Sequence, residues 1–125
     1  MLNIGRSFTF DAAHFISGHP TCGYMHGHTW YLDVKLIDCK TQKDGFVVDF
    51  KVLGGIVKDV LRHFDHKIIN DVVDFSPVTA ETLAVDIAAR IRRVLRKVTN
   101  IKSSQIYVRL QEGEGGYAEY TTDYS

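Results

Sequence analysis

Alternation of apolar and polar residues marks two extended segments in the first third of the chain. Between residues 4 and 11 apolar side chains occupy every second position at Phe8 and Phe10, and the same period runs from Trp30 to Leu36. Side chains of a β-strand alternate between its two faces, so both segments are predicted to be strands with one buried face. The Gly- and Pro-containing stretch from Ser17 to Gly23 predicts a loop between them.

A spacing of three and four residues replaces this alternation in the middle of the chain. Asp49 is predicted to cap a helix whose apolar residues recur as far as Phe64, although Gly54 and Gly55 weaken it by about 1 kcal/mol each. Close packing at these glycines would explain their presence. A second helix is predicted from Thr79 to about Val98, with a single apolar stripe.

The remaining segments complete the predicted topology. The polar turn Lys40–Gly45 and the run Phe46–Val48 predict a hairpin, and two strands follow the helices at Ile106–Leu110 and Tyr117–Thr122. Two strands, two helices and two strands indicate an α+β fold, with a four-stranded antiparallel sheet and two helices on one face. Residues 1–125 show no internal repeat or linker, so a single domain is expected.

Composition narrows the class of protein. The chain has 125 residues, 45% of them hydrophobic, and 15 Lys and Arg balance 15 Asp and Glu. Zero net charge argues against a general binder of nucleic acid or of anionic membranes, and no apolar run is long enough to span a bilayer. Two cysteines without a secretory signal predict reduced thiols and a cytoplasmic protein.

Three histidines provide the first candidate chemistry. His26 and His28 flank Gly27 just before the second predicted strand, and residues two apart in a strand point to the same face. His14 continues the apolar face of the first strand, so antiparallel pairing of the two strands would bring all three imidazoles together. Three imidazoles with an open fourth position are typical of catalytic zinc. The alternative is three ordinary histidines at strand ends.

Residues near these histidines could move protons. Cys22 lies on the predicted loop, where a metal and a basic partner would favour the thiolate and make it a base or nucleophile. Alternatively, Cys22 is a small buried apolar residue. Asp65 and His66 follow the first helix, and a carboxylate can fix the tautomer of an adjacent imidazole. A solvated helix end is the alternative for this pair.

Two further charged features are open to more than one interpretation. Glu112, at the end of the third predicted strand, can accept paired hydrogen bonds from the amino–imino edge of a heterocycle. Glu114 competes for this role, and a surface glutamate is the alternative. Basic residues cluster on the second helix, where they form either a solvated face or a phosphate-binding surface. These residues are Arg90, Arg92, Arg93, Arg96 and Lys97.

The candidates belong to a series of short motifs spread over nearly the whole chain. The motifs are Phe10-Asp-Ala-Ala-His14, Cys22-x3-His26-Gly-His28, Val48-Asp-Phe50, Phe64-Asp-His-Lys67, Asn70, Thr79-Ala-Glu81, Glu112 and Ala118-Glu-Tyr120. Their order resembles the 6-pyruvoyl-tetrahydropterin synthase family. The segment from Cys22 to His28, combined with Asp65-His66, is the most specific part of the resemblance.

This resemblance implies a zinc enzyme. The implied roles are zinc ligation by His14, His26 and His28, proton acceptance by Cys22, proton relay by Asp65 and His66, and anchoring of a pterin ring by Glu112. The three-residue gap between Cys22 and His26 is similar to that of the 6-carboxy-tetrahydropterin synthases of queuosine biosynthesis. The implied lyase converts 7,8-dihydroneopterin triphosphate to 6-carboxy-5,6,7,8-tetrahydropterin, acetaldehyde and triphosphate.

The resemblance also implies the tunnelling fold, in which several subunits assemble through their sheets. Four-stranded sheets of neighbouring subunits would join edge to edge into a barrel, giving a homo-oligomer, a hexamer of two trimers, with active sites between subunits. Three alternatives stay open. The chain could be a 6-pyruvoyl-tetrahydropterin synthase that releases triphosphate, or a non-catalytic module that binds zinc and a pterin. The third is a scaffold with structural zinc, whose fourth ligand would be Cys22 or His19.

Overall fold

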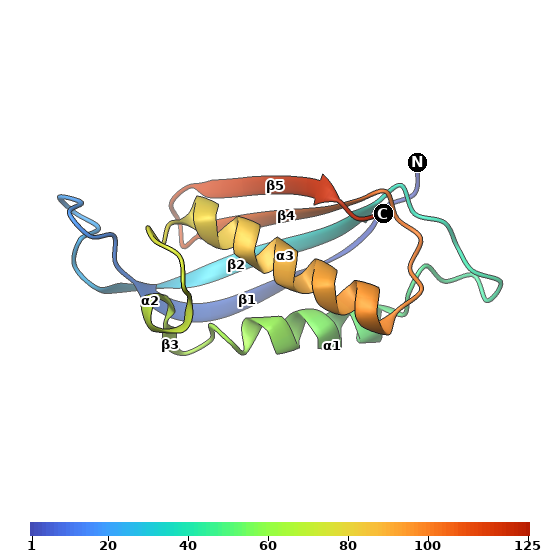
Figure 1. Ribbon diagram of the computed structural model, residues 1–125, viewed down its shortest axis with the longest axis horizontal. Coiled ribbons are helices and arrows are strands. Elements are labelled where there is room, and N and C mark those ends of the chain that lie inside the picture. Colours follow the sequence, from blue (N-terminus) through green and yellow to red (C-terminus); the bar gives the residue numbers. More distant parts are fainter.

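A computed structural model describes all 125 residues of the chain. One sheet holds five strands in the order β3-β1-β2-β4-β5, and the two long helices, α1 and α3, lie together on one of its faces (Figure 1). The strands are β1 (Ile4–His14), β2 (His26–Ile37), β3 (Lys67–Ile68), β4 (Gln105–Glu112) and β5 (Tyr117–Asp123). The helices are α1 (Phe50–Leu61), α2 (Ile69–Val72) and α3 (Ala80–Val98).

The predicted antiparallel pairing of the first two strands is confirmed. β1 and β2 pair along their full length, from Ile4 opposite Leu36 to His14 opposite His26. The same register places Ala12 opposite His28. As a result, the end of β1 and the beginning of β2 meet at one end of the sheet, from which the connecting loop projects (Figure 1).

Both long helices begin at side-chain caps. The Asp49 carboxylate accepts a hydrogen bond of 2.8 Å from the backbone N–H of Lys51. Thr79 and Thr82 cap the start of α3 reciprocally, each side chain accepting from the backbone N–H of the other. The helix α1 ends at Leu61, and the chain turns over the next five residues before it reaches β3.

The core lies between the sheet and the two long helices. Trp30 and Phe64 are its largest fully buried side chains, and β1, β2 and β4 present their alternate residues to it. Gly54 packs closely against the sheet, since a Cβ atom there would collide with the Arg6 guanidinium. Close packing at this glycine was expected, whereas a Cβ atom at Gly55 would meet nothing.

The predicted hairpin at Phe46–Val48 is wrong. These residues belong to the long connection between β2 and α1, where only an isolated bridge joins Lys40 to Lys102. The reason is topological: β1 and β4 already occupy both edges of β2, so a returning segment has no edge to pair with. Val47 is instead buried in the hydrophobic core, and Phe46 is exposed.

The sheet is mixed and has five strands where four antiparallel strands were expected. The additional strand, β3, consists of Lys67 and Ile68 and pairs parallel with Ala12 and Ala13 of β1. The helix α2 follows it immediately, so the predicted connection before α3 contains both short elements. The α+β class and the placement of the helices are confirmed. No helix in the structure combines the length and apolar character needed to cross a membrane.

The Asp49 cap gives a prediction about stability. The variant Asp49→Ala is expected to lower the free energy of unfolding by about 1 kcal/mol, because the N–H of Lys51 loses its acceptor. Chemical denaturation would measure this difference. Asp74→Ala, which removes an exposed carboxylate without a hydrogen-bond partner, is the matched control, and an equal effect of both variants would contradict the capping role.

Candidate metal centre and proton-transfer groups

The three predicted histidine ligands meet at the end of the sheet where β1 stops and β2 starts. The ring centroids of His14 and His26 are 4.6 Å apart, those of His26 and His28 are 4.7 Å apart, and those of His14 and His28 are 5.4 Å apart. One nitrogen from each ring and a carboxylate oxygen of Glu112 lie within 4.8 Å of one another. These distances are short enough for one ion to contact all four residues.

Backbone carbonyl groups orient two of the rings. His14 Nδ1 lies 2.9 Å from the carbonyl oxygen of Val78, just before α3, and His26 Nδ1 lies 2.7 Å from that of Tyr24. A carbonyl oxygen can only accept, so each Nδ1 carries the proton and each neutral ring keeps the lone pair of Nε2. A histidine that binds a metal commonly donates its other ring N–H to a carbonyl in this way.

The remaining nitrogens lack the partners that burial requires. Nε2 of His14 and Nε2 of His28 are buried and form no hydrogen bond within the protein, and the whole His14 side chain is inaccessible to solvent. An unpaired buried polar atom costs about 1–3 kcal/mol, whereas a bound cation would satisfy both atoms. Burial also lowers the pKa of His28 against the opposing influence of Glu112, which favours the neutral, ligating ring. The donor set therefore fits Zn²⁺.

Glu112 faces the histidines from the end of β4. Its Oε1 lies 3.1 Å from His28 Nε2, and its Oε2 lies 3.7 Å from His14 Nε2. The register of β4 explains this position, because Glu112 pairs with Trp30, whose side chain shares the sheet face of His28. Glu114 lies in the exposed turn before β5. The geometry suits Glu112 either as a fourth ligand or as an acceptor for a group bound beside the ion.

Asp65 and His66 form a second cluster on the turn after α1. His66 Nδ1 lies 3.0 Å from Asp65 Oδ1, which also accepts a hydrogen bond of 3.0 Å from the backbone N–H of Asp11. The backbone N–H of His66 donates to the carbonyl of Asp11 at 2.6 Å. His66 has φ +59°, a conformation uncommon for a residue with a side chain, so these contacts hold a strained backbone in place.

A cavity connects this second cluster with the histidines. Its volume is about 550 Å³, and His28 and His66 both line it, together with Lys67. The side chain of His66 is 79% exposed, so it is accessible to a bound molecule. His28, a candidate metal ligand, and His66, a candidate proton-transfer group, thus border the same space.

Cys22 lies in the loop that connects β1 and β2. Its backbone N–H donates to His19 Nδ1 at 2.9 Å, and its thiol lies 3.7 Å from the Thr21 hydroxyl. The structure does not place Cys22 or His19 in the group of four potential ligands, where Glu112 is the fourth member. This finding disfavours the structural-zinc alternative in the form that used either residue. Cys22 and Cys39 are both free thiols.

Sequence patterns missed the supporting contacts of the site. Asp11 holds the Asp65-His66 turn, and Thr29 Oγ1 donates to Asp11 Oδ1 at 2.6 Å. The Val78 carbonyl orients His14 across 64 residues of sequence. Backbone carbonyl and N–H groups leave no trace in a sequence, so neither contact had a detectable signal. The pairing of Thr29 with Asp11 follows only once the register of β1 and β2 is known.

The two thiols should differ in reactivity. Burial raises the pKa of Cys39, which is only 6% exposed, so its reactive thiolate is scarce. Under mildly alkaline conditions iodoacetamide is expected to label Cys22 rapidly and Cys39 only after unfolding. Mass spectrometry of tryptic peptides would follow both sites, with labelling in guanidinium as the control. Equal rates for both thiols in the folded protein would contradict this expectation.

The fold and the centre together define a class: an α+β domain whose sheet end carries three convergent imidazoles, a carboxylate and an aspartate–histidine pair. Comparison with protein families matches residues 3–123 to the family described as 6-pyruvoyl tetrahydropterin synthase. The chain therefore belongs to this family of enzymes.

Curated relatives carry the name of one branch of the family. A protein of Archaeoglobus fulgidus, provisionally named 6-carboxy-5,6,7,8-tetrahydropterin synthase, is 35% identical over 93% of this chain and 92% of its own length. The Bacillus subtilis 6-carboxy-5,6,7,8-tetrahydropterin synthase is 28% identical over 94% of this chain and 83% of its length. A Methanocaldococcus jannaschii protein with the same provisional name is 48% identical over 48% of this chain, and the match spans 37% of that protein.

Solved structures share the fold. The 6-pyruvoyl tetrahydropterin synthase of Plasmodium vivax superposes with a TM-score of 0.77 at 17% identity, covering 98% of this chain and 99% of that chain. The enzyme of Caenorhabditis elegans gives a TM-score of 0.75 at 20% identity, covering 98% of this chain and 96% of that chain. At these identities the likeness supports the architecture alone.

Proposed function

We propose that this chain is a zinc-dependent lyase that converts 7,8-dihydroneopterin triphosphate to 6-carboxy-5,6,7,8-tetrahydropterin, acetaldehyde and triphosphate, in queuosine or deazapurine synthesis. The observation that carries the proposal is the convergence of His14, His26 and His28, with two buried Nε2 atoms that form no hydrogen bond and face only the Glu112 carboxylate. Names of the curated relatives support the choice of reaction. The reaction is proposed to occur in the cytoplasm, where unpaired thiols persist.

The side chains at the site would have separate roles in the reaction. His14, His26 and His28 would hold zinc, which when bound polarises substrate oxygens and acidifies the neighbouring C–H and O–H bonds. Glu112 would accept hydrogen bonds from the pterin ring, for which its two oxygens are suitably placed at the rim of the centre. Lys67 lines the shared cavity and would supply positive charge for the triphosphate.

Proton transfer is assigned to two groups. Cys22 would accept a proton from the substrate side chain as a thiolate, and His66 would hold or deliver a proton at Nε2, because Asp65 engages its Nδ1 at 3.0 Å. Asp65 itself is fixed by the backbone N–H of Asp11, so the imidazole keeps its orientation. The exposed position of His66 leaves room for substrate and for a neighbouring subunit.

Assembly into a barrel is part of the proposal. At one side of the sheet, β3 covers only Ala12 and Ala13 of β1, and the rest of that edge has no strand beside it. At the other side, β5 is also an open edge. Unpaired edges of this length require cover, and pairing of β1 with β5 of another copy would provide it. A homo-hexamer of two trimers, with active sites between subunits, would follow the family pattern.

Product analysis tests the proposal. Zinc-loaded protein incubated with 7,8-dihydroneopterin triphosphate should yield the 6-carboxy product and acetaldehyde, both detected by mass spectrometry. A pyruvoyl product would instead assign the 6-pyruvoyl-tetrahydropterin synthase reaction. Equilibrium binding of the pterin without any product would identify a non-catalytic module. Absence of turnover with zinc in place would contradict both lyase assignments.

A further inference from the structure

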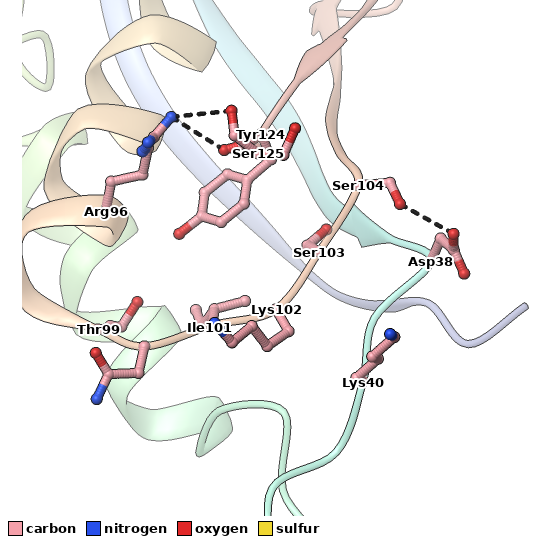
Figure 2. Close-up of a pocket in the computed structure, with 11 residues that line it drawn as sticks. Asp38, Lys40, Arg96, Thr99, Ile101, Lys102, Ser103, Ser104, Tyr124 and Ser125 are labelled. Carbon is pink, nitrogen blue, oxygen red and sulfur yellow. Dashed lines mark hydrogen bonds between the residues drawn. The ribbon is translucent and has the colours of Figure 1, made fainter.

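A second cavity lies at the opposite end of the sheet from the histidines. It has a volume of about 620 Å³ and is bordered by the end of α3, the segment that leads into β4, and the residues just after β2 (Figure 2). The strand β2 runs from His26 at the metal centre to Ile37 near this cavity, a span of roughly 36 Å at ~3.3 Å per residue. The two sites are therefore separate.

Cations outnumber acids around this cavity. Lys40, Arg96 and Lys102 line it, and the only acidic side chain among the lining residues is that of Asp38. The Asp38 carboxylate already accepts a hydrogen bond of 2.9 Å from the Ser104 hydroxyl. In a chain of zero net charge, this excess is a local concentration of positive charge.

The two lysines have no ionic partner. Lys40 and Lys102 lie directly opposite each other in an antiparallel bridge, joined by a backbone hydrogen bond of 3.0 Å. Residues opposite each other in such a bridge have Cβ atoms about 4.5–5.5 Å apart, so both lysine side chains start from neighbouring positions at the edge of the cavity. Neither ammonium group is within ion-pair distance of a carboxylate, although both side chains are exposed. A bound anion would give both ammonium groups an ionic partner.

Unpaired N–H donors accompany these charges. Residues 100–103 border the cavity, and the backbone N–H groups of Asn100, Ile101 and Ser103 donate to no acceptor in the protein, whereas that of Lys102 faces the Lys40 carbonyl in the bridge. The side-chain amide of Asn100 is also without a partner. Arg96 donates through Nη1 to the carbonyl groups of Tyr124 and Ser125, which fixes its guanidinium beside the cavity (Figure 2). Successive free N–H groups next to fixed cations are typical of sites for oxyanions.

We propose that this cavity binds a phosphate group, either as free inorganic phosphate or as part of a small phosphorylated molecule. A phosphate oxyanion carries close to two negative charges and several acceptor oxygens. It can therefore engage both lysines and the free N–H groups of Asn100, Ile101 and Ser103 together. A monocarboxylate carries one charge and two oxygens, so it would leave most of these donors unsatisfied. The site is independent of the reaction proposed for the metal centre.

Calorimetry on the full chain tests this assignment. Inorganic phosphate, tripolyphosphate and a nucleoside monophosphate are titrated separately at constant ionic strength, with acetate as the carboxylate comparison. We expect saturable binding of at least one phosphate compound, and the tightest of the three identifies the source of the group. The double variant Lys40→Gln/Lys102→Gln should weaken this binding by at least about tenfold, because two charge-assisted contacts are lost.

Two control variants test whether phosphate binds at this cavity. Lys43→Gln removes a charge from the same loop without altering a lining residue and should leave phosphate affinity unchanged. His26→Ala, at the metal centre, should leave unchanged the part of the phosphate binding that Lys40→Gln/Lys102→Gln removes, which separates this cavity from the proposed active site. The proposal is overturned if no phosphate compound binds saturably, if acetate binds as tightly, or if the lysine double variant binds like the unmodified chain.

Discussion

His26→Ala is expected to abolish tight zinc binding while leaving the fold intact. The substitution removes one of three converging nitrogen ligands, and loss of a supporting contact alone costs about 10–100-fold in metal affinity, so loss of a ligand should exceed this range. His26 is preferred over His14, because it lies at the half-buried rim, whereas His14 is fully buried against the core. Competition with a chelator of known zinc affinity would measure the effect.

His63→Ala provides the control for this experiment. His63 lies just after α1, and its Nε2 contacts the Val72 carbonyl at 2.7 Å, outside the group of potential ligands. This variant should bind one zinc ion per chain as tightly as the unmodified protein. One tightly bound zinc ion per chain in His26→Ala as well would contradict the assignment of the centre.

Zinc should also stabilise the unmodified protein against unfolding. In the apo form two buried Nε2 atoms form no hydrogen bond, and an ion that binds only the folded state adds about 4 kcal/mol at a free concentration 1,000 times its dissociation constant. In thermal unfolding, added zinc should raise the melting temperature of the unmodified chain but not that of His26→Ala. This comparison separates loss of the metal from loss of the fold.

Periodicity was sufficient to predict the long elements. The alternation in β1 and β2 and the apolar stripes of α1 and α3 each extend over at least seven residues, and all four elements bury one face. In contrast, β3 consists of two residues and has no periodicity to detect. The hairpin error had another origin, because the edges that remain open in a sheet depend on the order of its strands. Strand order is a long-range property that local patterns do not contain.

The candidate site was predictable to a similar degree. Alternate residues of a strand share one face, and directly paired residues of adjacent strands do so too. This rule was enough to predict that His14, His26 and His28 lie together. The position of Glu112 beside His28 was not predictable, since it depends on the register between β2 and β4, which are separated by two helices. The contact between Asp11 and Asp65 uses a backbone N–H across 54 residues and depends on where β3 joins the sheet.

Cys22→Ala is expected to separate metal binding from chemistry. Cys22 is not in the group of potential ligands, so the variant should bind zinc normally. Its turnover should fall by about 10²–10⁴-fold, the range typical for removal of a general base. Steady-state rates with 7,8-dihydroneopterin triphosphate, combined with zinc stoichiometry, would measure both quantities. Cys22→Ser should be similarly impaired, because a hydroxyl is a far weaker acid than a thiol and supplies almost no anion near neutral pH.

The second thiol offers the matched control for Cys22→Ala. Cys39 is buried at the far end of β2, in the hydrophobic core, and Cys39→Ala removes a thiol without touching the loop between β1 and β2. Its turnover should equal that of the unmodified chain, even if its thermal stability is lower. Full activity in Cys22→Ala would remove this residue from the mechanism and leave His66 as the remaining candidate base. Loss of zinc in the same variant would instead identify Cys22 as a ligand. It would favour the alternative of a structural zinc ion bound by four protein residues.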